Sequence, residues 1–140
     1  MALFGTKSPP EPTPPADAIV ELVEDGLVRV KFSGELDGAL VTRSMEKMRA
    51  LLKGKKVRVF VVDGMAITKV DMSMRAPSLE LLALVKASGA TSGFVSTSSS
   101  VVRLVATTLG VASGLRIELL ATTELAMRKA HAALKGVKEA

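Results

Sequence analysis

The sequence contains no cysteine, no tryptophan and no tyrosine. Without cysteine there is no disulfide framework, no thiolate metal site and no cysteine nucleophile. Aromatic residues make up only 3% of the chain, so the rings on which single-stranded nucleic acids stack are scarce. These absences argue against a disulfide-rich secreted protein, a thiol enzyme and a single-strand-binding protein.

Long apolar runs are also absent. No apolar stretch approaches the roughly 20 residues that a membrane-spanning helix needs, and residues 1–10 lack the basic-then-apolar pattern of a secretory signal. Hydrophobic residues nevertheless make up 48% of 140 residues, which is enough for one domain with its own core. We expect a soluble, cytoplasmic domain that uses no cofactor and no metal.

The charge balance is basic, with a formal net charge of +5. A basic balance favours a nucleic-acid or acidic-protein partner. Most basic residues, however, are spread over amphipathic segments as on ordinary solvated faces, so we expect no nucleic-acid partner. The densest cluster, Lys53, Lys55, Lys56 and Arg58, surrounds a predicted helix C-terminus, where cations are favourable. Its predicted role is solvated capping.

Proline is concentrated near the start. Residues 7–16 hold five of the six prolines, and such a stretch favours polyproline II or disorder. We predict a disordered Pro-rich tail over residues 1–17 and one folded domain over 18–140.

The folded part opens with a predicted hairpin. Alternating, β-branched runs occupy residues 19–24 and 27–32, and the dipeptide Asp25-Gly26 between them is a strong hairpin signal. We expect Gly34 to end the second strand.

Further strands are predicted downstream. The apolar run 57–62 is typical of a strand buried on both faces. We expect a turn at Asp63-Gly64 and then a short extended piece over 67–70. Two shorter strands are predicted over 93–97 and 116–120.

Four amphipathic helices alternate with these strands. Their predicted C-terminal signals are Lys53-Gly54, Ser88-Gly89, Gly110 and Gly136. Pro77 lies in the first turn of the second helix, where proline is tolerated, and Ser98, Ser99 and Ser100 offer caps for the third. The order ββαβαβαβα predicts an α/β fold with a mixed sheet whose parallel part is joined by crossovers.

Three short motifs lie at the junctions of these elements: Gly34-Glu35-Leu36-Asp37 before the first helix, Asp71 eight positions after Asp63, and the loop Asp71-Met72-Ser73-Met74. With the element order, they resemble the STAS family, the anti-sigma factor antagonists and their relatives, over residues 19–134. The last motif stands where family members typically have Asp-Ser-Ser-Gly.

The resemblance implies a non-enzymatic module that binds a regulatory protein, such as an anti-sigma factor, a serine kinase or another STAS protein. In the family, the second serine of the loop is phosphorylated by a partner kinase, and Ser73 matches it. The implied contact surface is the Asp71–Arg75 loop with the following helix. Its residues are Asp37, Lys69, Asp71, Met72, Ser73, Met74 and Arg75.

Phosphorylation of Ser73 would add about −1.5 to −2 charges beside a helix start. Lys69 and Arg75 would partly neutralise that charge, whereas Asp71 and Asp37, if close, would oppose it. The alternative interpretation is that Ser73 only caps the second helix, a common role for serine at such a junction.

Met72 and Met74 depart from the family pattern. They replace a serine and a glycine, and they either form an adaptable apolar contact surface or pack inward. Two other functions therefore stay open. One is a constitutive STAS subunit of a larger signalling or transporter-associated assembly, with Ser73 unmodified. The other is a small-ligand-binding module.

Other chemistry finds little support in the sequence. His131 is the only histidine, and neither a G-x-S-x-G nor a phosphate-binding glycine motif is present. The carboxylates of Asp37, Asp63 and Asp71 are of the type that binds divalent ions, but turns and caps explain such residues better.

Overall fold

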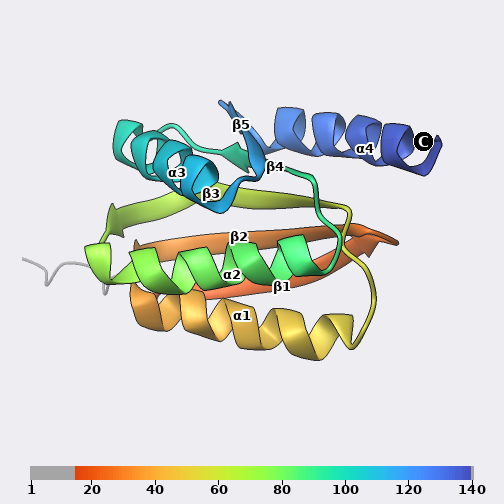
Figure 1. Cartoon of the computed structure of the whole chain (residues 1–140). Helices are drawn as coiled ribbons and strands as arrows, with labels where there is room; N and C mark the ends of the chain where they lie inside the picture. The colour runs from red at the N-terminus through yellow and green to blue at the C-terminus, as the bar shows by residue number, and fades with distance from the viewer. Residues whose placement is uncertain (1–14, 140) are drawn as a thin grey trace, which may run out of the picture.

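The structure, a computed structural model, describes residues 15–139, with side chains described as far as residue 136 (Figure 1). Of the tail predicted over residues 1–17, residues 1–14 lie outside the described range, and Asp17 is already the first residue of a strand. The elements in order are β1 (Asp17–Glu24), β2 (Leu27–Leu36), α1 (Gly38–Leu52), β3 (Val59–Val70), the 3-10 turn η1 (Met72–Met74), α2 (Arg75–Ala87), β4 (Ser92–Ser96), α3 (Ser100–Ser113), β5 (Arg116–Leu120) and α4 (Thr123–Glu139).

The five strands form one sheet in the order β1-β2-β3-β4-β5. Only the β1–β2 hairpin is antiparallel, and every later pair is parallel. Each crossover moves one strand further in the same direction, so crossovers of one hand place α1, α2 and α3 on the same face. The last helix, α4, covers the other face. The predicted mixed α/β sheet is confirmed.

The core has two parts, one on each face of the sheet. Strand alternation turns Val28 and Val30 toward α1 and α2, and it turns Leu27 toward α4. On α4, the small residues Ala126 and Ala130 are fully buried, which lets this helix lie close to the strands. The two clusters hold α1, α2 and the strand ends in fixed positions, and these ends carry the sites described below.

Gly34 does not end β2, contrary to the sequence prediction, because the strand continues to Leu36. Gly34 has φ +81°, and a Cβ there would lie 2.9 Å from the Cα of Ala16. The glycine is required by this backbone shape and by the close passage of the chain before β1.

The turn predicted at Asp63-Gly64 is also wrong, because β3 runs without a break to Val70. An Oδ1 of Asp63 accepts a hydrogen bond from the N–H of Met65 (3.1 Å). The pairing shifts by one residue here, from Lys31 opposite Asp63 to Ser33 opposite Ala66. The Asp-Gly pair therefore makes a bulge in a long strand, a local bend that the same residues support as readily as a turn.

Two predicted helix ends need correction. Gly110 lies inside α3, which ends instead at Gly114, a left-handed residue with φ +75°. A Cβ on Gly110 would lie 3.3 Å from the side chain of Ile117, so this glycine serves the contact of α3 with β5. Gly136 lies inside α4, which extends to Glu139. The end of α1 is as predicted, with Lys53 in the left-handed region.

The start of the outer edge of β1 is covered by side chains from α1. A guanidinium nitrogen of Arg43 donates to the carbonyl of Ala16 (3.3 Å), and the ammonium group of Lys47 donates to the carbonyl of Ala18 (2.5 Å). These bonds occupy backbone acceptors that an edge strand would otherwise leave open.

Candidate partner-docking site

The residues predicted to form the site come together at one end of the sheet. There β3 ends, η1 and α2 begin, and the start of α1 lies beside them, at the left of Figure 1. The N–H of Asp71 donates to the carbonyl of Leu36 (2.9 Å). This bond ties the loop after β3 to the end of β2, so two segments 35 residues apart in sequence share one surface.

Two aspartates cap the two segments. Asp37 has an extended backbone (φ −124°) and accepts a hydrogen bond from the N–H of Leu40 (2.9 Å), so it is the N-cap of α1. Asp71 (φ −105°) caps η1 in the same way and accepts from the N–H of Ser73 (3.1 Å).

Ser73 joins the two capped segments. Its Oγ accepts a hydrogen bond from the N–H of Gly38, the first residue of α1 (3.0 Å), and donates one to the carboxylate of Asp71. The residue is exposed. The hydroxyl thus lies at the positive end of α1 as well as near the start of α2, where sequence reasoning had placed it.

Gly38 was missed by the sequence analysis. A Cβ at this position would lie 2.6 Å from the carbonyl oxygen of Ser73, a separation that real side chains do not reach. Only glycine lets the loop approach the start of α1 so closely. One signal in the sequence could have revealed this contact: a glycine directly follows the N-cap aspartate, although helix propensity does not favour glycine at that position.

The electrostatics of the site centre on Asp71. The hydrogen bond from the Ser73 hydroxyl, followed by the bond from the Ser73 backbone N–H, lowers the pKa of the Asp71 carboxyl, and Lys69 adds a smaller effect in the same direction. Asp71 is therefore ionised at neutral pH. Lys69 also lies 4.0 Å from a carboxylate oxygen of Glu35, and Arg75 is exposed at the start of α2.

The two methionines have different environments. Met72 is 64% exposed, whereas Met74 is only 3% exposed. The sulfur of Met74 accepts a weak hydrogen bond from the buried hydroxyl of Ser78 (3.9 Å). Met74 therefore packs inward, whereas Met72 is exposed to solvent.

Met74 and Ser78 line an apolar cavity of about 80 Å³ between α2, α3 and the sheet. This is about half the volume of a cavity known to hold one benzene molecule. A cavity of this size offers no room for a metabolite.

A groove of about 310 Å³ lies directly beside the loop, between the end of β3 and the start of α3. Its lining includes Ile67, Lys69 and Val101, and Val101 is 56% exposed. The contact surface predicted from the sequence does not include α3.

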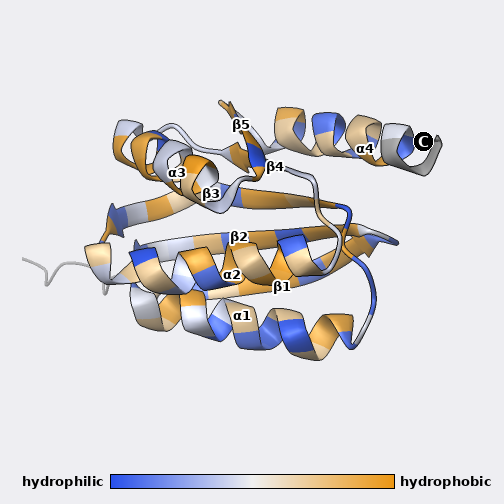
Figure 2. Cartoon of the chain, in the orientation of Figure 1, coloured by the Kyte–Doolittle hydropathy of each residue, from blue (hydrophilic) through white to orange (hydrophobic). Residues whose placement is uncertain are grey.

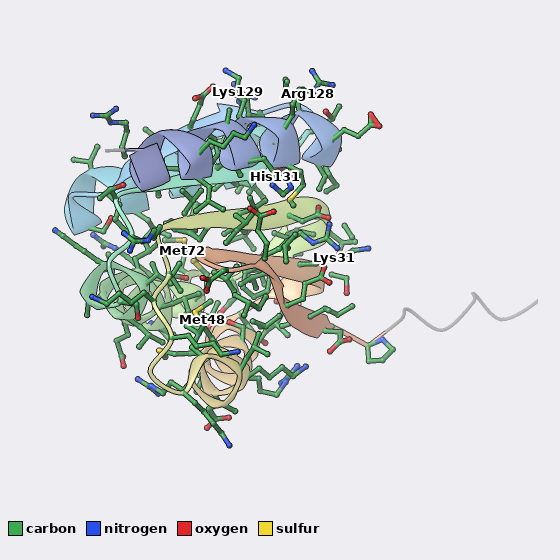
Figure 3. All side chains as sticks on the ribbon, turned by 90° about the vertical axis from the view of Figure 1, so that its right-hand side faces the viewer. Lys31, Met48, Met72, Arg128, Lys129 and His131 are labelled. Atoms are coloured by element: carbon green, nitrogen blue, oxygen red, sulfur yellow. The ribbon has the colours of Figure 1, made fainter. Side chains whose placement is uncertain are left out.

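The other residues weighed from the sequence lie apart from the loop or have local roles. His131 is on the side of α4 that faces the sheet (Figure 3), and its Nδ1 lies 3.3 Å from a carboxylate oxygen of Glu24, at the hairpin end of the sheet. Among the described residues, no three His, Asp or Glu side chains gather as a metal site would require. In residues 15–139, no helix combines the length and the apolar character that crossing a membrane requires.

No family model matches the sequence, and no curated protein sequence matches it. Solved structures do match. The anti-sigma factor antagonist SpoIIAA in its unphosphorylated form has a TM-score of 0.62 and 21% identity, with 82% of this chain and 96% of that chain covered. The chain has the fold of SpoIIAA. The phosphorylated form of SpoIIAA from Bacillus matches with a TM-score of 0.59 and 21% identity, covering 80% and 97% of the two chains.

The structure is also similar to that of an uncharacterised protein from Shewanella loihica, which is described as having a SpoIIAA-like fold. That match has a TM-score of 0.61 and 12% identity and covers 82% of this chain and 93% of the other. The STAS resemblance drawn from the element order is thereby confirmed for the fold. At these identities, the role of Ser73 and its neighbours stays a prediction.

Proposed function

We propose that the chain is a non-enzymatic regulatory module that binds a protein partner through the Asp71–Arg75 loop and the first turns of α2, and that phosphorylation of Ser73 switches this binding. The observation that carries the proposal is the position of the Ser73 hydroxyl, which is exposed and bonded to both Gly38 and Asp71. The proposed location is the cytoplasm, because an anti-sigma factor or its kinase acts there.

The apolar contacts of the proposed surface come from Met72 and the groove beside it. Met72 presents a flexible, polarisable side chain to solvent, which suits a protein contact. Lys69 and Arg75 add cations around it, and Asp37 and Asp71 add carboxylates. A partner with a small protruding apolar side chain, surrounded by both acidic and basic residues, would complement this surface.

Phosphorylation would change the surface in a defined way. The phosphate ester removes the proton that the Ser73 hydroxyl donates to Asp71, and it places a dianion beside a carboxylate that is ionised. Repulsion then breaks the Ser73–Asp71 contact, whereas the N–H of Gly38 and the positive end of α1 still attract the phosphate. We expect the phosphorylated loop to stay in contact with the N-terminus of α1. The hydrogen bonds between Asp71 and Ser73 should be lost, which changes the backbone beside Met72.

The test combines phosphosite mapping with partner binding. The full chain is isolated from its native cells under several stresses, and phosphate on Ser73 is measured by mass spectrometry. Proteins that co-purify with the Ser73→Ala variant are then compared with those of Ser73→Asp. We expect one partner that binds Ser73→Ala at least tenfold more tightly than Ser73→Asp.

Thr122→Asp is the matched control, because Thr122 is an exposed hydroxyl residue that also follows a strand and precedes a helix but lies outside the groove. It should bind the partner as the wild type does. An unmodified Ser73 under every condition, together with equal binding by the Ala and Asp variants, would contradict the switch.

One observation favours a second function, a constitutive subunit of an assembly. Val101, Leu104 and Val111 on α3 are 56%, 69% and 81% exposed, and their spacing of three and seven residues places them on one stripe of the helix. An assembly subunit would elute from native lysate in a large complex whichever residue occupies position 73. The switch protein would leave its complex when Ser73 is replaced by Asp.

A further inference from the structure

The end of the sheet opposite Ser73 carries a concentrated positive charge. Five cations surround the end of α1 and the start of β3, and we call them the basic end: Arg49, Lys53, Lys55, Lys56 and Arg58. All five side chains are exposed. Figure 2 shows the connection from α1 to β3 in the blue of hydrophilic residues.

These cations exceed what helix capping requires. The C-termini of α1 and α2 both lie at this end, and each contributes about half a negative charge. Together they offset about one of the five positive charges. Among the side chains described over residues 15–136, no carboxylate forms an ion pair with any of the five. An excess of charge is left for a partner.

The basic end is concave. A groove of about 390 Å³ runs between the ends of α1 and α2, lined by Arg49, Lys53, Lys55 and Lys56 with the apolar side chains of Leu52, Leu84 and Ala87. A second groove of about 240 Å³ adjoins it, because both are lined by Lys55 and Lys56. Arg58 extends this groove along the start of β3, and Asp25 contributes one carboxylate against its three cations. The cations thus surround a partly apolar groove.

Lys53 supplies an independent observation. It has φ +39° and is the one non-glycine residue with positive φ in the described part of the chain. Glycine is the usual residue at a left-handed helix end, and a residue with a Cβ is less stable there. A lysine at this strained position lines the larger groove, which suggests that its charge serves binding.

We propose that the basic end is a second interaction surface, which binds an acidic peptide segment of a partner protein with apolar residues between its carboxylates. Charge complementarity selects an anion, and the apolar lining selects a partner with apolar side chains. A nucleic-acid backbone has no such groups, and no aromatic residue lines the grooves for its bases. A flat bilayer does not enter a concave groove. This proposal does not depend on the role of Ser73.

The test uses the full chain and a fluorescein-labelled peptide of glutamates with a leucine at every third position, measured by fluorescence anisotropy. We expect saturable binding that weakens several-fold as the salt concentration rises from about 50 to about 200 mM. A peptide with serine in place of leucine should bind at least threefold more weakly, because it leaves the apolar lining without a partner.

Two variants locate the binding. Lys55→Glu with Lys56→Glu should weaken peptide binding at least tenfold. The matched control is Arg103→Glu with Arg128→Glu, two exposed cations on α3 and α4 that lie outside the grooves, and it lowers the net charge equally. Arg128 points away from the sheet (Figure 3). This control should bind the peptide within twofold of the wild type once salt screens the net charge.

Lys53→Gly is a second variant for the case in which the charge reversals disturb folding, because it removes one cation of the groove without adding a negative charge. It should weaken binding about threefold, while the melting temperature stays unchanged or rises by about 2 °C. Equal loss in the control variant, no binding of the peptide, or tighter binding of oligothymidine or of phosphatidylserine vesicles through the same lysines would each overturn the proposal.

Discussion

The two ends of the parallel strands differ in what they present to solvent. At the end that carries Ser73, helix N-termini meet and aspartates cap them, so hydrogen bonds between neighbouring segments fix the backbone. At the basic end, helix C-termini meet and exposed cations surround a groove without ion partners among the described side chains. One end is ordered by local bonds and suits a switch, whereas the other is a charged surface that suits long-range attraction.

This difference follows from the topology. When helices join parallel strands, every helix starts at the carboxyl ends of the strands and finishes at their amino ends. The two ends of the sheet are therefore chemically distinct. Residues that cap helix N-termini, such as aspartate and serine, gather at one end of the sheet. Lysine and arginine are favoured at the other end, and a binding function there would favour further cations.

The largest expected effect compares one glycine from each end. Gly38→Ala places a Cβ 2.6 Å from the carbonyl oxygen of Ser73, and we expect it to lower the free energy of unfolding by about 2 kcal/mol. Gly54→Ala meets no atom within 4 Å but has φ +87°, so it should cost about 1 kcal/mol. Urea denaturation measures both. A smaller loss for Gly38→Ala than for Gly54→Ala would show that the contact between the loop and α1 is loose.

A smaller and opposite pair of effects is expected at the two termini of α1. Asp37→Ala removes the N-cap bond to Leu40 and should cost about 1 kcal/mol. Lys53→Gly removes the strain of a lysine with left-handed backbone, but glycine also makes the unfolded chain more flexible. We expect a net increase of about 0.5 kcal/mol in the free energy of unfolding. Thermal unfolding monitored by circular dichroism shows both signs. A stability loss in Lys53→Gly would mean that its side chain stabilises the helix end.

The smallest effect concerns pH. The pKa of Asp71 is lowered from its ordinary value of 3.8 in the folded protein, so its hydrogen bonds stabilise the fold above that value and the contribution disappears as the pH falls below it. The exposed position of Asp71 keeps the effect small. In an NMR titration, the Asp71 carboxyl should titrate below 3.8, and Ser73→Ala should move its pKa upward. An unchanged pKa in Ser73→Ala would argue against the hydrogen bond from the hydroxyl.

Local patterns predicted the elements well because most of them depend on neighbours in sequence. The Asp25-Gly26 hairpin and the strand over 116–120 are as predicted. Two of the errors concern glycines whose role is set by residues outside the local pattern. Gly34 faces Ala16 and Gly110 faces Ile117, and neither contact can be read from the local pattern, so each glycine was interpreted as a stop.

Several residues of the candidate site could be selected from the sequence, but Gly38, Val101 and the geometry of the site could not. Asp37 and Asp71 indeed cap neighbouring segments, as their positions before helices indicated. The bond from Gly38 to Ser73 joins residues 35 positions apart, and the groove involving Val101 depends on how α3 packs. Both need the tertiary structure. The basic cluster was visible in the sequence, but its concave shape was not.

The covered start of the β1 edge limits how copies of this chain can associate. Arg43 and Lys47 occupy the outward carbonyls of Ala16 and Ala18, so an incoming strand would first have to displace two cations from their acceptors. Continuous sheets built across molecules, the usual start of fibrous aggregation, are therefore disfavoured at this edge. At the start of this edge, two exposed side chains of α1 therefore hinder the pairing of one copy with another.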